Sequence, residues 1–191
     1  MFDYPILSLL IWAPIFIGIL LIMMRSISDN LSQLITLLTT FLILIVSINL
    51  SQAYDSTSSQ LQFIERIEWI SGLNIYYYLA VDGISISLIL LTAFINFLIA
   101  IYASSENYKN KQAFLGYFLI LEGLLMGTFS AFDSILFYIF FESLLIPLFL
   151  IIGIWGGANR KYATFKFFLY TLFGSVLMLI SIIYLAQTSG S

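Results

Sequence analysis

Apolar residues fill long windows of this chain, and short polar segments separate these windows. A helix of about 20 predominantly apolar residues crosses the ~30 Å hydrocarbon core of a bilayer. Counted on this basis, the sequence predicts six membrane-spanning helices: residues 5–24, 31–50, 84–102, 113–132, 134–154 and 164–185. The first window lacks the basic flank and small-residue cleavage site of a signal peptide, so we expect it to be retained. The predicted fold class is all-α, a polytopic membrane helix bundle forming a single transmembrane domain, residues 1–191.

The longest polar connection covers residues 51–82. Within it, residues 60–70 and 74–81 are rich in aromatic and β-branched side chains, and Ser71 and Gly72 separate them. Such a pattern is typical of two strands joined by a turn. We therefore expect a surface hairpin in this loop, lying on the membrane surface.

Composition supports a membrane protein. Hydrophobic residues make up 61% of the chain, charged residues only 9%, and the mean hydropathy is +1.05, whereas ordinary globular chains carry about 25% charged residues. No basic stripe is present to hold a nucleic acid. The chain contains no Cys and no His, which removes the usual ligands of zinc, haem and iron–sulfur clusters. We expect this chain to bind no cofactor and no metal.

The basic residues predict an orientation. The loops after the first, third and fifth windows hold Arg25, then Lys109 and Lys111, then Arg160 and Lys161, and the opposite side offers Arg66. Because lysine and arginine accumulate in cytoplasmic loops, these three loops should face the cytoplasm or the matrix. The N-terminus and the loop 51–82 would then lie on the periplasmic or intermembrane side.

Glu142 is the main candidate for chemistry. It lies well inside the fifth apolar window, where a charged side chain costs about 2.5 to 3.5 kcal/mol unless it faces protein or water. Pro147 lies five residues on. A proline cannot donate to the carbonyl four residues before it, here that of Ser143, so we expect a helix break beside Glu142. The alternative is that Glu142 only forms a hydrogen bond between helices.

Glu122 and Lys166 are weaker candidates for the same proton path. Counted from the turn at Asp133, Glu122 lies roughly 16 Å along the fourth helix and Glu142 roughly 13 Å along the fifth. If both faced inward, the two carboxylates would compete for a proton, which favours proton uptake and release. The alternative for Glu122, as for Glu142, is that it only forms a hydrogen bond between helices. Lys166 lies about two residues into the sixth helix, of order 15 Å in depth from Glu142, so it either snorkels to the interface or takes part through water.

Several motifs in the second half of the chain resemble one protein family. They are Phe137-Tyr138-Ile139-Phe140-Phe141-Glu142, Leu145-Ile146-Pro147, Ile154-Trp155-Gly156-Gly157 and Phe165-Lys166-Phe167-Phe168-Leu169-Tyr170-Thr171. Together with Val81-Asp82-Gly83-Ile84-Ser85 they resemble subunit 4 of proton-pumping NADH:quinone oxidoreductase, respiratory complex I, called subunit M in bacteria.

The resemblance implies a longer chain of about fourteen helices with an inverted repeat and broken helices, related to Mrp-type cation/proton antiporter subunits. It implies that Glu142 is the key carboxylate, paired with a lysine of a seventh helix that these 191 residues do not include. We therefore interpret the sequence as an N-terminal portion that works with the remaining helices and with other membrane subunits.

The function that follows from the resemblance is a proton half-channel in the membrane arm of complex I, coupled to electron transfer from NADH to ubiquinone. NADH, FMN, iron–sulfur clusters and quinone would be used elsewhere in the complex. The membrane would be the mitochondrial or the bacterial inner membrane. Two alternatives stay open: an Mrp-type cation/proton antiporter subunit, and a structural fragment that conducts nothing.

Overall fold

The computed structural model describes residues 5–24, 27–58, 60–73, 75–105 and 108–189. Within these ranges six helical segments are long and apolar enough to cross a membrane, which confirms the predicted helix bundle. The helices are α1 (Ile6–Met23), α2 (Asp29–Ala53), α3 (Gly83–Ser105), α4 (Lys111–Ser130), α5 (Ser134–Ser143), α6 (Leu145–Trp155) and α7 (Arg160–Ser189). Helices α5 and α6 together make one span, Ser134–Trp155.

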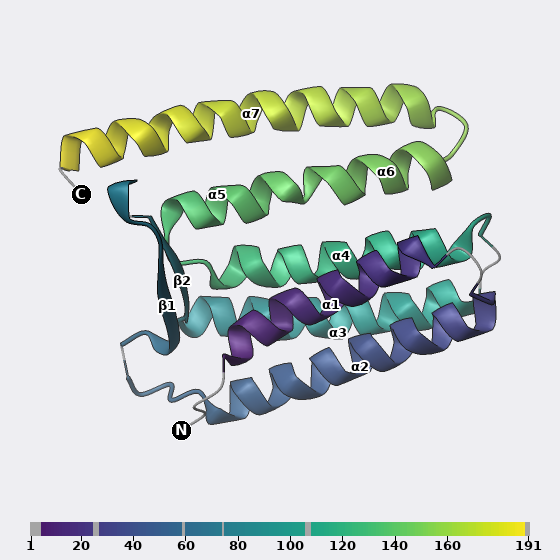
Figure 1. The fold of residues 1–191 in the computed structure, drawn as a ribbon, viewed down its shortest axis with the longest axis horizontal. Helices are drawn as coiled ribbons and strands as arrows, with labels where there is room; N and C mark the ends of the chain where they lie inside the picture. Colours follow the sequence, from purple (N-terminus) through teal and green to yellow (C-terminus); the bar gives the residue numbers. More distant parts are fainter. Residues whose placement is uncertain (1–4, 25–26, 59, 74, 106–107, 190–191) are drawn as a thin grey trace.

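The helices run nearly parallel to one another, and their connections gather at two ends (Figure 1). We call the end with the α3–α4 and α6–α7 turns the basic side, because Lys109, Arg160 and Lys161 lie there. The other end, the hairpin side, carries the start of α1, the end of α7 and the strands β1 (Gln62–Ile70) and β2 (Ile75–Val81). Arg25 lies outside the described residues.

Several helices are longer than their apolar windows. Helix α7 begins at Arg160 and ends at Ser189, so Arg160 and Lys161 lie in its first turn and not in a loop. Lys111, which was also assigned to a loop, is the first residue of α4 and is buried. The reason is that helical hydrogen bonding continues past the hydrocarbon-length segment that the apolar window detects.

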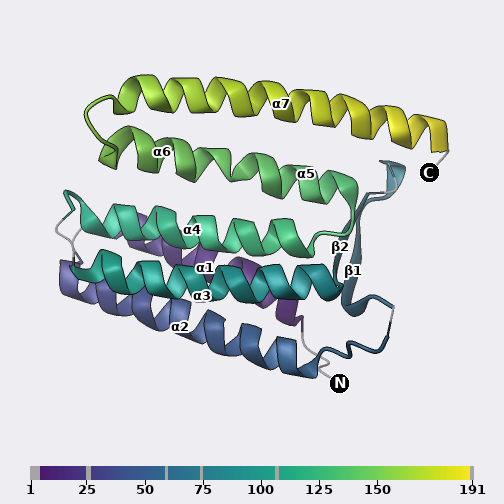
Figure 2. The same cartoon turned by 180° about the vertical axis from the view of Figure 1, so that it is seen from behind.

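Helices α1 to α4 form a closely packed group, and α5, α6 and α7 extend from it in succession, as the view from behind shows (Figure 2). Helix α7 packs on α6 and α5. Only 6% of its most apolar window is buried within the chain. The outer face of α7 is therefore an apolar surface that would meet lipid or other protein.

Glycines allow α1 and α4 to approach closely. A Cβ atom on Gly116 would lie 2.7 Å from the carbonyl oxygen of Gly18, and one on Gly18 would lie 2.5 Å from the carbonyl oxygen of Gly116. A Cβ on Gly123 would collide with the carbonyl oxygen of Ile11. Gly127, next along the same row, packs against the Phe140 ring of α5 instead. Small residues thus fix which face of α4 meets α1.

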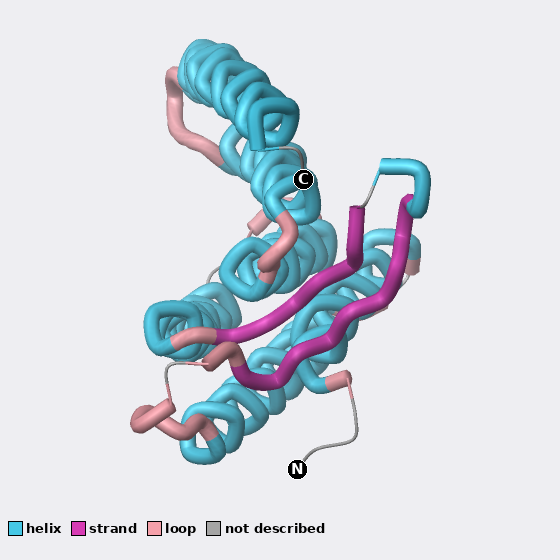
Figure 3. The backbone as a smooth tube through the Cα atoms, turned by 90° about the vertical axis from the view of Figure 1, so that its left-hand side faces the viewer, coloured by secondary structure: helices cyan, strands magenta, loops and turns pink. Residues whose placement is uncertain are grey.

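The segment predicted to hold a hairpin forms an antiparallel strand pair, joined by a short 3₁₀ turn (Ser71–Leu73). The pair lies across the hairpin-side ends of the helices (Figure 3). Its carboxylates bind helix ends: Glu65 accepts hydrogen bonds from the N–H groups of Leu7 (2.7 Å) and Ser8 (3.1 Å) at the start of α1. Tyr76 of β2 donates its N–H to Asp133, which precedes α5.

Asp82 and Asp133 cap the next two helices that begin on this side. The Asp82 carboxylate accepts from the N–H groups of Ser85 (2.7 Å) and Ile84 (3.1 Å). The Asp133 carboxylate accepts from Ile135 (2.9 Å) and Leu136 (3.0 Å). The backbone hydrogen bond from Ser85 is the main reason that the pKa of Asp82 lies below its usual value of 3.8.

The first prediction concerns the α1–α4 contact. We expect Gly123→Ala to destabilise the protein by about 1 to 3 kcal/mol, because the new methyl group overlaps the α1 backbone. Thermal unfolding of the purified protein in detergent measures the effect. Gly174→Ala is the matched control, since nothing lies within 4 Å of its added Cβ. Equal stability of the two variants would contradict the proposed close packing.

The second prediction concerns the Asp82 cap. We expect Asp82→Ala to lower the free energy of unfolding by about 1 kcal/mol at neutral pH. Because the folded-state pKa is lowered, this contribution is present above the usual pKa of 3.8 and disappears as the pH falls through the folded-state pKa. Unfolding curves of native and variant protein should therefore converge in acid. Glu68→Ala, which removes an exposed carboxylate of β1, is the control, and a difference that persists in acid would argue against capping by the carboxylate.

Candidate functional site

Glu142 lies in the last turn of α5, beside the interruption between α5 and α6. The interruption falls at Leu144, and the ring of Pro147 cannot supply the N–H that the carbonyl of Ser143 would otherwise accept. Glu142 is partly buried, and its Oε2 is fully buried with no hydrogen-bond partner. The carboxylate thus sits next to a weakened point of the helix, where water or another polar group can reach it.

Glu142 faces away from α4. Phe140, two residues earlier, packs on Gly127 of α4, and two residues turn a helix by roughly 200°. The Glu142 side chain therefore leaves α5 on the side opposite to the α4 contact.

Glu122 is completely buried, and neither of its carboxylate oxygens has a hydrogen-bond partner. It lies in the middle of α4, next to Gly123, which faces α1. Met126, one turn further along, belongs to a core cluster with Ile43 of α2 and Ala93 of α3. Gly123 faces α1 and Gly127, about 40° further round the helix, faces α5. Glu122 is turned about 100° from Gly123 in the opposite sense, so it lies on the side of α4 that is left for α2 and α3.

The structure does not bring the two glutamates together. Glu122 faces α2 and α3, whereas Glu142 points away from α4. No hydrogen bond links them, since both Glu122 oxygens are unpartnered. The expected pair of neighbouring carboxylates is replaced by two separate carboxylates on different sides of the bundle.

Lys166 lies on the exposed side of α7. Its Nζ is 5.7 Å from the centre of the Tyr162 ring and 6.0 Å from that of Tyr170. Thr164, which is buried, marks the face of α7 toward the rest of the chain, and two residues turn the helix by roughly 200° away from it. Lys166 therefore points away from the side of α7 that packs on α6.

Helices α2, α3 and α4 also bury polar residues that the sequence analysis did not select. They are Ser32, Thr36, Thr39, Thr40 and Ser47 of α2, Asn96 of α3, and Lys111, Thr128 and Ser130 of α4. Ser32, Thr36 and Thr40 are spaced by four residues, which places them on one face of α2. That spacing in an apolar helix is the signal in the sequence that could have identified them.

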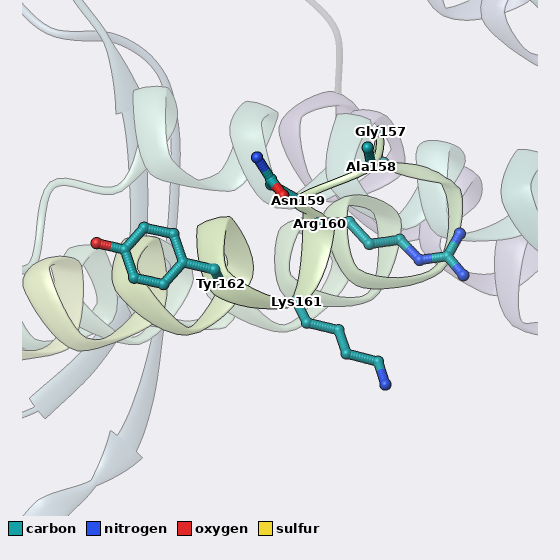
Figure 4. A pocket seen from close by; sticks show the side chains of 7 residues that line it. Gly157, Ala158, Asn159, Arg160, Lys161 and Tyr162 are labelled. Carbon is teal, nitrogen blue, oxygen red and sulfur yellow. The ribbon is translucent and has the colours of Figure 1, made fainter.

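The turn between α6 and α7 forms a shallow hollow lined by residues 156–162 (Figure 4). The Tyr162 ring points one way along α7, and the Arg160 and Lys161 side chains extend the other way. Arg160 donates to the carbonyl of Ile154 at 2.9 Å, so it caps the end of α6. Trp155 donates to the carbonyl of Lys109 at 2.7 Å and joins this turn to the α3–α4 connection. In the part of the chain that the structure describes, no group of three or more His, Cys, Asp or Glu side chains could hold a metal.

Comparison with known proteins identifies relatives of this chain. Residues 131–191, which include Glu142, Pro147 and Lys166, match a family described as NADH:quinone oxidoreductase/Mrp antiporter, transmembrane. NADH-quinone oxidoreductase subunit M of Rickettsia prowazekii is 37% identical over 189 residues, which cover 97% of this chain and 38% of the relative. This chain is homologous to subunit M. The resemblance seen in the sequence motifs is thereby confirmed.

Further homologues of subunit M type extend the comparison to plants. NADH-ubiquinone oxidoreductase chain 4 of Arabidopsis thaliana is 37% identical and covers 97% of this chain and 38% of that protein. A chain of respiratory complex I from Thermus thermophilus superposes with a TM-score of 0.77 at 30% identity, over 97% of this chain and 37% of that one. This chain thus spans about two fifths of the length of the curated relatives it matches.

An archaeal membrane-bound sulfane sulfur reductase has a chain with the same fold. Its TM-score is 0.82 at 17% identity, over 98% of this chain and 38% of that chain. At this identity the likeness concerns the fold alone. The helix arrangement is therefore shared by respiratory membrane complexes of different chemistry.

Proposed function

We propose that this chain is part of a membrane-arm subunit of an NADH:quinone oxidoreductase and contributes a half-channel for protons. The observation that carries the proposal is Glu142, a partly buried carboxylate with an unpartnered oxygen beside a helix interruption. Homology to subunit M over 97% of the chain supports the assignment. Because the chain matches 38% of that relative, the whole channel would need further helices.

In this proposal Glu142 holds a proton and releases it when its electrostatic surroundings change. A cation supplied by the remaining helices would lower the cost of the charged carboxylate, and removal of that cation would favour proton uptake. Pro147 keeps backbone carbonyl groups and water available beside the carboxylate. Electrons would pass through NADH, FMN, iron–sulfur clusters and quinone in other subunits, and this chain would bind none of these groups.

The basic side would face the cytoplasm or the matrix, because Lys109, Lys111, Arg160 and Lys161 gather there. The N-terminus and the hairpin would lie on the periplasmic or intermembrane side. The partners would be the remainder of the subunit, other complex I membrane subunits and lipid.

An exchange of Na⁺ or K⁺ for protons, without electron transfer, is the second candidate function. The matching family model includes Mrp antiporters in its description, and a buried glutamate suits either activity. Ion flux in vesicles without NADH would support the antiporter, whereas flux that depends on NADH oxidation would support complex I.

The third prediction tests Glu142. We expect Glu142→Gln to lower NADH-driven proton uptake in membrane vesicles by about tenfold or more, as loss of a positioned proton-transfer group does, while the complex still assembles. Glu68→Gln, which changes an exposed glutamate of β1, is the matched control and should pump normally. Normal pumping by an assembled Glu142→Gln complex would contradict the proposal.

A further inference from the structure

We propose that the buried polar residues between α2, α3 and α4 form a water-filled access path that connects Glu122 to the basic side. The observation behind this proposal is that Glu122 is 0% exposed and that neither of its carboxylate oxygens has a hydrogen-bond partner. A buried carboxyl group without hydrogen bonds is costly, and water is the partner that a polar interior admits. This path is separate from Glu142, which leaves α5 on the side away from α4.

Helix packing places polar residues next to Glu122. Counted from the basic-side ends of their helices, Ile43 lies roughly 21 Å along α2, Ala93 roughly 18 Å along α3 and Met126 roughly 22 Å along α4, so these three core residues lie at a similar depth. A step of three or four residues toward the basic side, about 5 Å on each helix, leads from Ile43 to Thr40, from Ala93 to Asn96 and from Met126 to Glu122. All three residues reached by this step are buried. One level of the bundle therefore holds a hydroxyl, an amide and a carboxyl group.

The polar face of α2 continues from this level to the basic side. Thr36 and Ser32 follow Thr40 at intervals of four residues, and both are buried. The hydroxyl groups donate in sequence to their own helix: Thr40 to the carbonyl of Thr36 (3.1 Å), Thr36 to that of Ser32 (2.9 Å), and Ser32 to that of Asp29 (2.8 Å). Each hydroxyl oxygen keeps its lone pairs and can accept from water or from a protonated carboxyl group.

The path has an opening on the basic side. A hollow between the α1–α2 connection and the start of α4 is lined by Ile27, Asp29, Asn110 and Gln112, among others. Asp29, which lies one turn before Ser32 on α2, is exposed, so the hydroxyl row ends at the surface of the basic side. Toward the hairpin side Ile43, Ala93 and Met126 interrupt the polar residues, and the buried Ser47 that lies beyond them is followed by the apolar Leu50 and Ile89. The uninterrupted row of polar residues thus leads to the basic side.

The charges around Glu122 are few. Helix α1 contains no ionisable residue, α2 contributes Asp29 at its exposed start, and α3 contributes the exposed Tyr102. On α4, Lys111 shares the face of Glu122 but begins the helix, roughly 16 Å away. Proton exchange through water between the basic side and the carboxylate is therefore the means by which Glu122 changes its charge.

Cysteine substitution tests whether the path contains water. The chain has no cysteine, so Thr36→Cys and Thr40→Cys each introduce one thiol, and Ile43→Cys is the control on the same face. Ag⁺ is applied to one side of oriented vesicles that contain the assembled complex, and the thiol is alkylated after denaturation. We expect Ag⁺ on the basic side to abolish alkylation at positions 36 and 40 but not at 43. Full alkylation at both positions, or protection from the hairpin side, would overturn the path.

Infrared spectroscopy tests whether the path serves Glu122. The carboxylic acid band that Glu122→Gln removes is followed after transfer of the complex to D₂O. We expect Thr40→Val combined with Asn96→Leu to slow deuterium exchange of this band about tenfold, because two hydrogen-bonding groups are lost. Thr128→Val is the control, since Thr128 is buried on another face of α4. Equal exchange in all variants would refute the assignment.

The cysteine experiment tests the access path without assuming the proposed function. Only the purpose for which Glu122 would take up a proton rests on that function. Protection of positions 36 and 40 by Ag⁺ requires no electron transfer. If Glu142→Gln pumps normally while this protection is observed, the proposed role of Glu142 fails and the access path stands. If Glu142→Gln stops pumping and no protection is seen, the reverse holds.

Discussion

Carboxylates on the hairpin side hold the N-terminal amides of three helices, and the alignment of the bundle depends on them. Glu65 binds α1, Asp82 binds α3 and Asp133 binds α5. The first amides of a helix have no partner within the helix, and hydrocarbon offers them none. Because Glu65 belongs to β1 and Tyr76 of β2 binds Asp133, the hairpin sets where α1 and α5 begin relative to each other. It thereby fixes the depths at which Glu122 and Glu142 lie.

The close backbone contact between α1 and α4 determines which helices the other faces of α4 contact. Gly116 and Gly123 bring the two helices so close that no side chain fits between them. Glu122 is adjacent to Gly123 in the sequence, so it is turned away from this contact and toward α2 and α3. A bulky residue in place of either glycine would rotate or displace α4, and with it the carboxylate.

The number of helices could be predicted from the sequence, because a bilayer demands about 20 apolar residues for each crossing. The sequence did not predict which face of each helix points toward the other helices, since residues that face lipid and residues that face protein are equally apolar. The pairing expected for Glu122 and Glu142 rested on depth alone, and depth does not specify rotation about the helix axis. The hydrogen bonds from Leu7 to Glu65 and from Tyr76 to Asp133 were also inaccessible, because they join positions 58 and 57 residues apart. The row of Ser32, Thr36 and Thr40 was readable in the sequence.

The separation of the two glutamates bears on how a proton could use them. Glu142 lies at a helix interruption on the side of α5 away from α4, and Glu122 lies among α2, α3 and α4. Direct transfer between them would have to pass the α4–α5 contact, where Phe140 packs against Gly127. That contact is apolar and closely packed, so it excludes the water that a proton requires. In the proposed mechanism the two carboxylates would therefore act separately: Glu122 would exchange protons with one aqueous side, and Glu142 would respond to groups that approach from beyond α5 and α6.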